Sequence, residues 1–179
     1  GGSARALAFD VTDLAAVHDA ISSAGGTDIL VNNAGNAGTG GFGTLKPFVE
    51  SDPADWAPYF AVNLYGVMNC VHAALPAMIE QSWGRVVTIV SDAGRIGEAY
   101  MAPYAAAKSG AATFCRSIAR EVSRYDITVN NVALGTMRTP LTSAVYDDPA
   151  RAEQKKAILA PYLVRRPGEP EDAAWAVAM

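Results

Sequence analysis

The chain has 179 residues, of which 50% are hydrophobic and 18% are charged. This composition is typical of a folded domain with a sizeable core, and it excludes an intrinsically disordered chain. The net charge of −4 gives no general attraction to nucleic acid or to an anionic membrane surface, so neither is expected as a partner.

Short apolar runs alternate along the chain with segments in which apolar residues recur at helical spacing. Asp52-Pro53 and Asp148-Pro149 each place an Asp cap before a proline at the first helical position, where the missing N–H costs nothing. Thr12 or Asp13 is the expected cap of the first helix, and an irregularity is expected at Pro76. We predict, in chain order, strand 5–9, helix 14–24, strand 28–32, a glycine-rich loop at 38–43, helix 53–81, strand 85–91, helix 103–124, strand 127–133, and helices that begin at Pro149 and Pro170.

This order of elements predicts an α/β fold. Apolar strands separated by helices indicate a doubly wound parallel sheet, buried and covered by helices on both faces. The sequence contains no internal repeat, low-complexity tract or interdomain linker. We therefore expect a single domain over residues 1–179.

Cysteine and histidine patterns do not indicate a metal site or a disulfide framework. Cys70 and Cys115 make no CxxC pattern and are expected to be buried, reduced thiols of a cytoplasmic protein, with a disulfide between them as the alternative. His18 and His72 are isolated in the sequence, so no metal site is expected. The chain contains no run of about 18 apolar residues that would predict a membrane-spanning helix, and residues 1–5 do not resemble a targeting peptide.

The strongest chemical signal is Tyr104, followed four residues later by Lys108 in a predicted helix. One helical turn places both side chains on one face, about 5–6 Å apart at Cβ. A neighbouring ammonium is expected to lower the pKa of the phenol, which suits a general acid for an alkoxide or a general base for an alcohol. Ser91 lies at the carboxyl end of a predicted strand, where doubly wound sheets bind ligands, and its hydroxyl could hold the substrate oxygen. On spacing alone, an exposed Tyr–Lys pair is the alternative.

Further motifs favour the catalytic interpretation. Asn32-Asn33-Ala34-Gly35 at a strand end, then Asn63, Ser91, Tyr104 and Lys108, occur in the order typical of the short-chain dehydrogenase/reductase family. Asp10-Val11-Thr12-Asp13 and Gly135 with Thr139-Pro140 add to this pattern, and the chain resembles the family over its whole length. The resemblance implies a Rossmann-type sheet, NAD or NADP as cofactor, and hydride transfer between the cofactor and a secondary alcohol or ketone.

The resemblance also implies individual roles. Tyr104 would be the catalytic acid/base, Lys108 would hold the nicotinamide ribose and lower the pKa of the tyrosine, and Ser91 would polarise the substrate carbonyl. Asn63 would position a water in a proton relay to Lys108. Asn32 and Asn33 have an alternative role, which is to bond neighbouring strands and turns. The residues implied to contact the cofactor are Asp10, Val11, Asn33, Ala34, Gly35, Tyr104, Lys108, Gly135, Met137 and Thr139.

Two features depart from the family pattern. Leu134 replaces the usual proline before Gly135, which removes a fixed φ but leaves the backbone amides available. Gly1-Gly2-Ser3 precedes a predicted strand, so it is not a glycine-rich phosphate loop. We therefore expect a longer parent protein that also has the first strand–glycine loop–helix–strand unit and the last strand. The choice between NAD and NADP depends on the loop after the second family strand, so it stays open.

Several functional alternatives remain. The rival to an enzyme is a non-catalytic fragment or remnant with a role in assembly. Residues 139–167 are expected to form a lid that favours a hydrophobic or cyclic substrate or an acyl thioester. Lys155-Lys156 is expected to be a solvated helix face, with a phosphate contact to a coenzyme A thioester as the alternative. The stripe Phe114, Ile118 and Val122 belongs either to the core or to the interface of a homodimer or homotetramer.

Overall fold

Side-chain caps define the helix starts as the sequence predicts. The computed structural model describes residues 2–36, 46–140 and 142–179. Asp13 caps the first helix by accepting hydrogen bonds from two backbone amides, and Asp52 forms a capping box with Asp55 at the start of the second. Contacts divide the chain into two compact units, Gly1–Asn131 and Val132–Met179.

The elements lie close to their predicted positions. Helices are found where apolar periodicity and caps coincide, and the three strands follow the runs rich in β-branched residues. The first unit contains α1 (Leu14–Ser23), β1 (Ile29–Asn32), the 3₁₀ turn η2 (Phe48–Glu50), α2 (Pro53–Phe60), the π turn η3 (Ala61–Gly66), α3 (Val67–Glu80), β2 (Gly84–Ser91), α4 (Ala93–Ile96), α5 (Ala102–Val122), the 3₁₀ turn η4 (Ser123–Tyr125) and the start of β3 (Ile127–Leu134). The second contains α6 (Ser143–Tyr146), the 3₁₀ turn η5 (Pro149–Arg151), α7 (Ala152–Leu159) and α8 (Pro170–Ala178).

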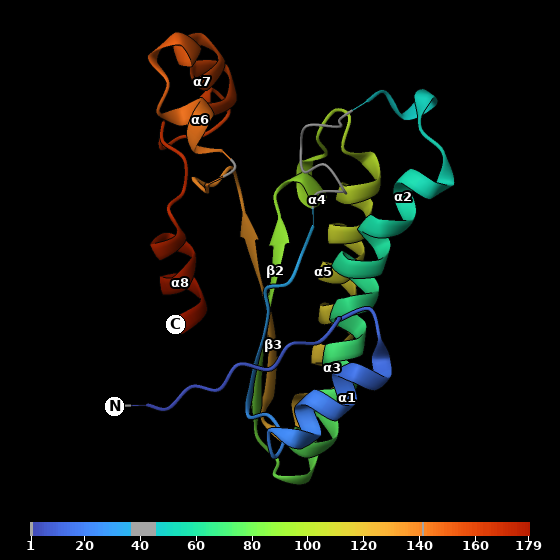
Figure 1. Cartoon of the computed structure of the whole chain (residues 1–179). Coiled ribbons are helices and arrows are strands. Elements are labelled where there is room, and N and C mark those ends of the chain that lie inside the picture. The colour runs from blue at the N-terminus through green and yellow to red at the C-terminus, as the bar shows by residue number, and fades with distance from the viewer. Residues whose placement is uncertain (1, 37–45, 141) are drawn as a thin grey trace. The chain divides into compact units, whose positions relative to one another are not determined.

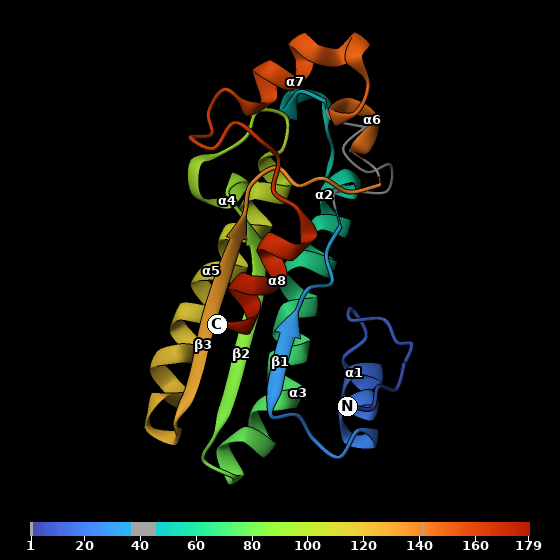
Figure 2. The ribbon, with the colours of Figure 1, turned by 90° about the vertical axis from the view of Figure 1, so that its left-hand side faces the viewer.

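The strands form a sheet in the order β1-β2-β3. β1 and β2 are parallel, in a register that pairs Ile29 with Arg85 and Asn32 with Thr88. Helices α3 and α5 contact the strands, and Figure 2 shows them behind β1 and β2. In Figure 1, α1 lies beside α3, in agreement with the contacts between them. The predicted α/β class and parallel pairing are confirmed.

The core of the first unit lies between this sheet and its helices. Along β2, buried side chains alternate with partly exposed ones, as expected for a strand with one face against helices. Gly84 is required at the start of β2, because a Cβ atom there would lie 2.5 Å from Sδ of Met78. Phe114 and Ile118 are only partly buried, so the core stripe of α5 is offset from the predicted one. The fully or nearly fully buried apolar residues include Val17, Val71, Ala74, Met78, Val86, Ala107, Ala111, Cys115 and Val122.

Two predictions about the strands are wrong. Residues 5–9 form neither strand nor helix, and Leu7 and Phe9 are about two-fifths exposed. No described strand pairs with this segment, and an apolar run without a hydrogen-bonded neighbour cannot form a sheet. β1 is not buried on both faces either, since Ile29 is 58% exposed and Val31 is 42% exposed.

The predicted helix 53–81 is interrupted by the π turn η3, not at Pro76, which lies inside α3. Pro58 in α2 lacks an N–H and its ring crowds the preceding turn. The side-chain Nδ2 of Asn63 donates to the carbonyl of Tyr59 at 3.0 Å, the acceptor that a regular helix would offer to the backbone N–H of residue 63. The side chain thus replaces a helical hydrogen bond, and the helix widens at Asn63.

The two cysteines are as predicted, and the two histidines meet in the fold. Cys70 and Cys115 are buried free thiols. His18 and His72 are isolated in the sequence, but Nε2 of the first lies 3.1 Å from Nδ1 of the second across α1 and α3. Within the described residues, no group of three potential metal ligands occurs. By length and composition the segment Pro53–Glu80 would pass for a membrane span, but 44% of its most apolar part is buried, which is also typical of a core helix.

The second unit has its own small core. Tyr146 and Leu159 are buried, and the backbone N–H of Thr136 donates to the hydroxyl of Tyr162 at 3.0 Å. The predicted helix starts at Pro149 and Pro170 are confirmed, the first as the 3₁₀ turn η5 that leads into α7. Nζ of Lys155 donates to the carbonyl of Tyr146 at 3.1 Å, so this lysine is not simply solvated. Leu141 and the predicted loop 38–43 lie outside the described residues.

Candidate active site

Three of the predicted catalytic residues come together where β2 ends and α5 begins. Ser91 is the last residue of β2, and its Oγ accepts the backbone N–H of Ala93 at 3.2 Å. Tyr104 lies in the first turn of α5 and is hydrogen-bonded to Ser91. Lys108 follows one turn later on the same helix. The strand-end position and the helical spacing bring these groups together as the sequence predicts.

Lys108 is a buried cation. Its side chain is 5% exposed, and its Nζ donates to the carbonyl of Ile89 at 2.9 Å. Burial lowers the pKa of Lys108 from 10.5 to about 8, because desolvation disfavours the charged form. Gly94 permits this packing, since a Cβ atom there would lie 2.9 Å from the backbone N of Ser109.

The predicted effect of Lys108 on Tyr104 is wrong. Burial raises the pKa of the Tyr104 phenol above its usual value, and the hydrogen bond with Ser91 opposes this shift only in part. The ammonium of Lys108 is instead directed to the carbonyl of Ile89. The phenol is therefore in its protonated, proton-donating form at neutral pH.

Asn63 is fully buried and held from both sides. Its Oδ1 accepts the backbone N–H of Asn36 at 3.2 Å, and its Nδ2 lies 3.0 Å from the Asn36 carbonyl and 2.8 Å from the Asn36 Oδ1. Asn36 also donates from its own Nδ2 to the carbonyl of Pro58 at 3.1 Å. Sequence reasoning missed Asn36, although a polar residue directly after Asn32-Asn33-Ala34-Gly35 was a visible signal.

Gly35 marks a close approach between the loop after β1 and this polar cluster. A Cβ atom added at Gly35 would lie 3.1 Å from Oδ1 of Asn63 and 3.3 Å from Nζ of Lys108. Any larger residue would therefore press on both side chains. A glycine at this point leaves a cradle of backbone beside a cation and an amide, which fits the hydrogen-bonding sugar and phosphate groups of a nicotinamide dinucleotide.

Of the remaining predicted cofactor residues of the first unit, Asp10, Asn33 and Ala34 are exposed and Val11 is partly buried. Asp10 accepts hydrogen bonds at 2.8 Å from both the N–H and the hydroxyl of Thr12, which lower its pKa. The carbonyl of Val11 accepts from Asn69 at 2.9 Å. Asn33 and Ala34 are exposed beside β1. Asn32, by contrast, is buried and donates to Oγ1 of Thr88 at 3.1 Å, so it joins β1 to β2, the alternative role considered for it.

Three predicted cofactor residues belong to the second unit. Gly135 has no room for a side chain, since a Cβ atom there would lie 2.6 Å from the ring of Tyr162. The carbonyl of Met137 and the backbone N–H of Thr139 both bond to Oγ1 of Thr142, at 2.8 Å each. These contacts order the turn after β3.

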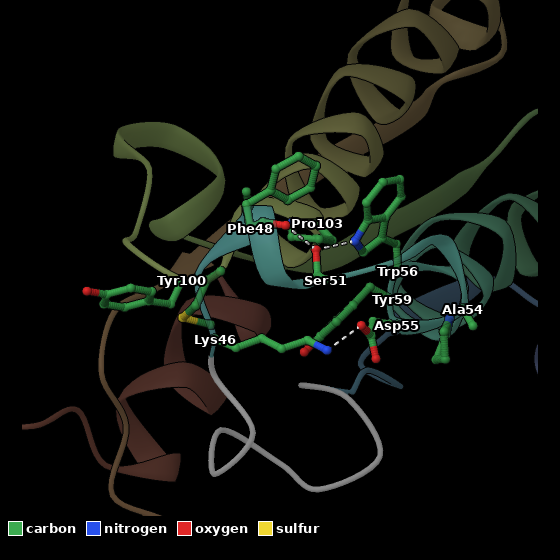
Figure 3. A pocket seen from close by; sticks show the side chains of 12 residues that line it. Lys46, Phe48, Ser51, Ala54, Asp55, Trp56, Tyr59, Tyr100 and Pro103 are labelled. Atoms are coloured by element: carbon green, nitrogen blue, oxygen red, sulfur yellow. Dashed lines mark hydrogen bonds and ion pairs between the residues drawn. The ribbon is translucent and has the colours of Figure 1, made fainter.

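A pocket of about 430 Å³ lies between α2 and the start of α5, and sequence reasoning missed it (Figure 3). Its walls come from two separate segments, one around η2 and α2 and the other immediately before Tyr104. Tyr59, which lines it, makes an edge-on ring contact with Tyr104 at a centroid distance of 6.1 Å. The pocket residues are Lys46, Phe48, Ser51, Ala54, Asp55, Trp56, Pro58, Tyr59, Tyr100, Met101, Ala102 and Pro103.

Comparisons with known proteins agree with this geometry. A family model described as short chain dehydrogenase matches residues 1–150. The 3-oxoacyl-[acyl-carrier-protein] reductase FabG of Vibrio cholerae is 36% identical over 182 residues, which cover 99% of this chain and 70% of the relative. The acetoacetyl-CoA reductase of Synechocystis is 36% identical over 180 residues, which cover 99% of this chain and 72% of the relative.

Solved structures are similar as well. A gluconate 5-dehydrogenase from Burkholderia cenocepacia, in complex with NADP and tartrate, has a TM-score of 0.81 and 31% identity over 94% of this chain and 64% of its own. A xylitol dehydrogenase with bound NAD⁺ has a TM-score of 0.83 and 26% identity over 94% of this chain and 69% of its own.

Proposed function

The chain belongs to the short-chain dehydrogenase family and is an NAD(P)-dependent oxidoreductase, and from this premise we propose that it interconverts a secondary alcohol and a ketone with Tyr104 as the general acid/base. The observation that carries the proposal is the cluster of Ser91, Tyr104, Lys108 and Asn63 beside the Gly35 cradle. The alternative of a non-catalytic remnant is not favoured, because all four side chains are present and hydrogen-bonded.

The chain's own residues divide the work of the reaction. When bound, the nicotinamide cofactor supplies a hydride to the carbonyl carbon or accepts one from the alcohol carbon. Ser91 donates a hydrogen bond to the substrate oxygen, where negative charge develops during reduction. Tyr104 gives its phenolic proton to that oxygen, which completes the alcohol, and takes the proton back in the reverse direction. Burial raises the pKa of Tyr104, which favours the proton-donating form of its phenol.

Cofactor contacts follow from the same cluster. Lys108 would hold the nicotinamide ribose with the ammonium hydrogens that its bond to Ile89 leaves available. Asn63 would fix a water on the proton path to Lys108. By resemblance to the family, Asp10, the backbone of Val11 and the loop residues Asn33, Ala34 and Gly35 would hold the adenosine side of the cofactor. The same resemblance assigns the nicotinamide end to Gly135, Met137 and Thr139.

Substitution of the phenol tests this function. We expect Tyr104→Phe to lower kcat by about 10²–10⁴-fold, the usual contribution of a general acid, while cofactor binding persists. Tyr125→Phe is the matched control, since Tyr125 lies in η4, at the opposite end of α5 from Tyr104. Turnover is followed by the absorbance of reduced nicotinamide, and binding is followed by its fluorescence. Unchanged kcat in Tyr104→Phe, or no binding of either NADH or NADPH by the full-length protein, would contradict the proposal.

Assembly, location and domain structure belong to the same proposal. We infer a single Rossmann-type domain that acts in the cytoplasm as a homodimer or homotetramer. Tyr65 and Met68 leave apolar surface exposed on one stretch of helix, and Phe114 and Ile118 do so in part on α5, which supports self-association. Sedimentation equilibrium tests the self-association, and a monomer at every protein concentration would contradict it.

A further inference from the structure

We propose that the pocket beside Tyr59 binds a flat, uncharged, apolar part of the substrate, so that the enzyme acts on aryl or cyclic ketones and their alcohols in preference to polyols. We name it the aromatic pocket and define it by Phe48, Ser51, Trp56, Tyr59 and Tyr100. This inference rests on the proposed function, because it assigns the substrate class of the same site.

The walls of the aromatic pocket are built from rings. Phe48 and Trp56 stack at a centroid distance of 5.0 Å with 19° between their planes, and Figure 3 shows them on one side of the pocket with Tyr100 on another. Tyr100 is held at a φ of 67°, a conformation that costs energy for a non-glycine residue. A volume of about 430 Å³ lies in the range of small-ligand sites, and flat aromatic walls favour a flat apolar guest.

Four of the polar side chains that line the pocket, those of Ser51, Trp56, Lys46 and Asp55, are already paired. Oγ of Ser51 donates to the carbonyl of Phe48 at 2.7 Å and accepts from Nε1 of Trp56 at 2.7 Å. Nζ of Lys46 lies 2.6 Å from Oδ2 of Asp55, so these two charges cancel. A polyol placed here would lose hydrogen bonds to water without gaining equivalent ones from these groups, whereas an aryl or cycloalkyl group has none to lose.

The aromatic pocket is connected to the reacting groups through two residues. Tyr59 lines it and also contacts the ring of Tyr104. Pro103 lines it and directly precedes Tyr104 in α5. In this proposal, a ketone whose oxygen meets Tyr104 extends its remaining substituent past Tyr59 toward the pocket. The substrate carbonyl and the substrate body are thus recognised by neighbouring sites.

Filling the pocket is the direct test. Ala54 lines it, and Ala54→Leu would occupy its volume, whereas Ala57→Leu adds the same side chain to the same helix at an exposed position outside it. We expect Ala54→Leu to lower kcat/KM for acetophenone and cyclohexanone by about tenfold or more, and to leave acetone within about twofold. Ala57→Leu should leave all three substrates unchanged. Xylitol and gluconate should be poor substrates of the unmodified protein.

Removing a wall is the complementary test. Phe48→Ala should lower kcat/KM for acetophenone by about tenfold through KM, since an aromatic contact is lost. Val49→Ala is the control, because Val49 is 89% exposed in the same turn and does not line the pocket. Acetophenone binding, measured by saturation-transfer NMR, gives a second readout that does not require turnover.

The outcomes separate the two proposals. Equal losses for acetone and acetophenone in Ala54→Leu, preferred turnover of polyols, or acetophenone binding that Ala54→Leu does not weaken would overturn the inference while leaving the catalytic role of Tyr104 intact. Full activity of Tyr104→Phe would overturn the proposed function instead.

Discussion

Lys108→Met should make the folded protein more stable at neutral pH while abolishing its activity. Burial lowers the pKa of Lys108 from 10.5 to about 8, and one pKa unit corresponds to about 1.4 kcal/mol. The charged form therefore costs the folded state about 3 kcal/mol. Methionine removes this cost and keeps a flexible side chain of similar length, but it leaves the Ile89 carbonyl without its donor, which costs about 1 kcal/mol. The net gain is about 2 kcal/mol in the free energy of unfolding.

The pH dependence gives this prediction its sharpest test. Between pH values of about 8 and 10.5, the unfolded chain holds a proton on Lys108 that the folded chain does not. The stability of the unmodified protein therefore rises with pH through this window, and that of Lys108→Met does not. Urea unfolding without cofactor, at about pH 7 and about pH 10, should show the advantage of the variant shrinking at the higher value. Lys156→Met is the control, since Lys156 is 80% exposed. The reasoning would be refuted if Lys108→Met were less stable than the unmodified protein at neutral pH. It would also be refuted if the difference between their free energies of unfolding did not change with pH.

Two further substitutions test the close approaches in the site. Gly35→Ala should weaken reduced-cofactor binding and lower kcat/KM by about tenfold or more, because the added Cβ would lie 3.1 Å from Oδ1 of Asn63 and 3.3 Å from Nζ of Lys108. Fluorescence titration measures the binding of the reduced cofactor. Gly2→Ala is the control, because a Cβ atom there meets nothing within 4 Å. Thr88→Val should lower the free energy of unfolding by about 1–3 kcal/mol, because it leaves the buried amide of Asn32 without its acceptor. Thr128→Val is the control, because Thr128 is exposed in β3, and it should change the urea midpoint little. Equal effects of Thr88→Val and Thr128→Val on the midpoint would contradict this account.

The positions of the proposed catalytic residues could be predicted from the sequence because their signals are local. The four-residue spacing of Tyr104 and Lys108 needs only one helix, and the position of Ser91 needs only a strand end. The family resemblance then supplied Asn63, whose role no spacing rule indicates. Capped helix starts at Pro53 and Pro170 were equally predictable, since capping depends on a few adjacent side chains.

The features that were missed depend on contacts between distant segments. Residues 5–9 have the composition of a strand, but a strand exists only with a hydrogen-bonded neighbour. The π turn at Asn63 depends on a side chain that replaces a backbone donor, which periodicity does not reveal. The aromatic pocket joins residues around α2 to residues 100–103, so neither segment alone indicates it. The substrate-specific lid that the sequence predicts at residues 139–167 stays a prediction.

Two of the four buried polar or charged side chains in the described chain, Asn63 and Lys108, lie at the site, and the other two join β1 to β2. The four side chains are Asn32, Asn63, Thr88 and Lys108. Each is hydrogen-bonded, but paired polar groups contribute less to stability than apolar packing of the same volume, and Lys108 is a net cost. The folding energy must therefore come from the apolar contacts of α3 and α5 with the sheet. It follows that, among these four residues, a stabilising apolar replacement is expected at Lys108, where it should abolish activity. Replacements in the apolar stripe of α5 should instead lower stability and leave the chemistry of the folded fraction unchanged.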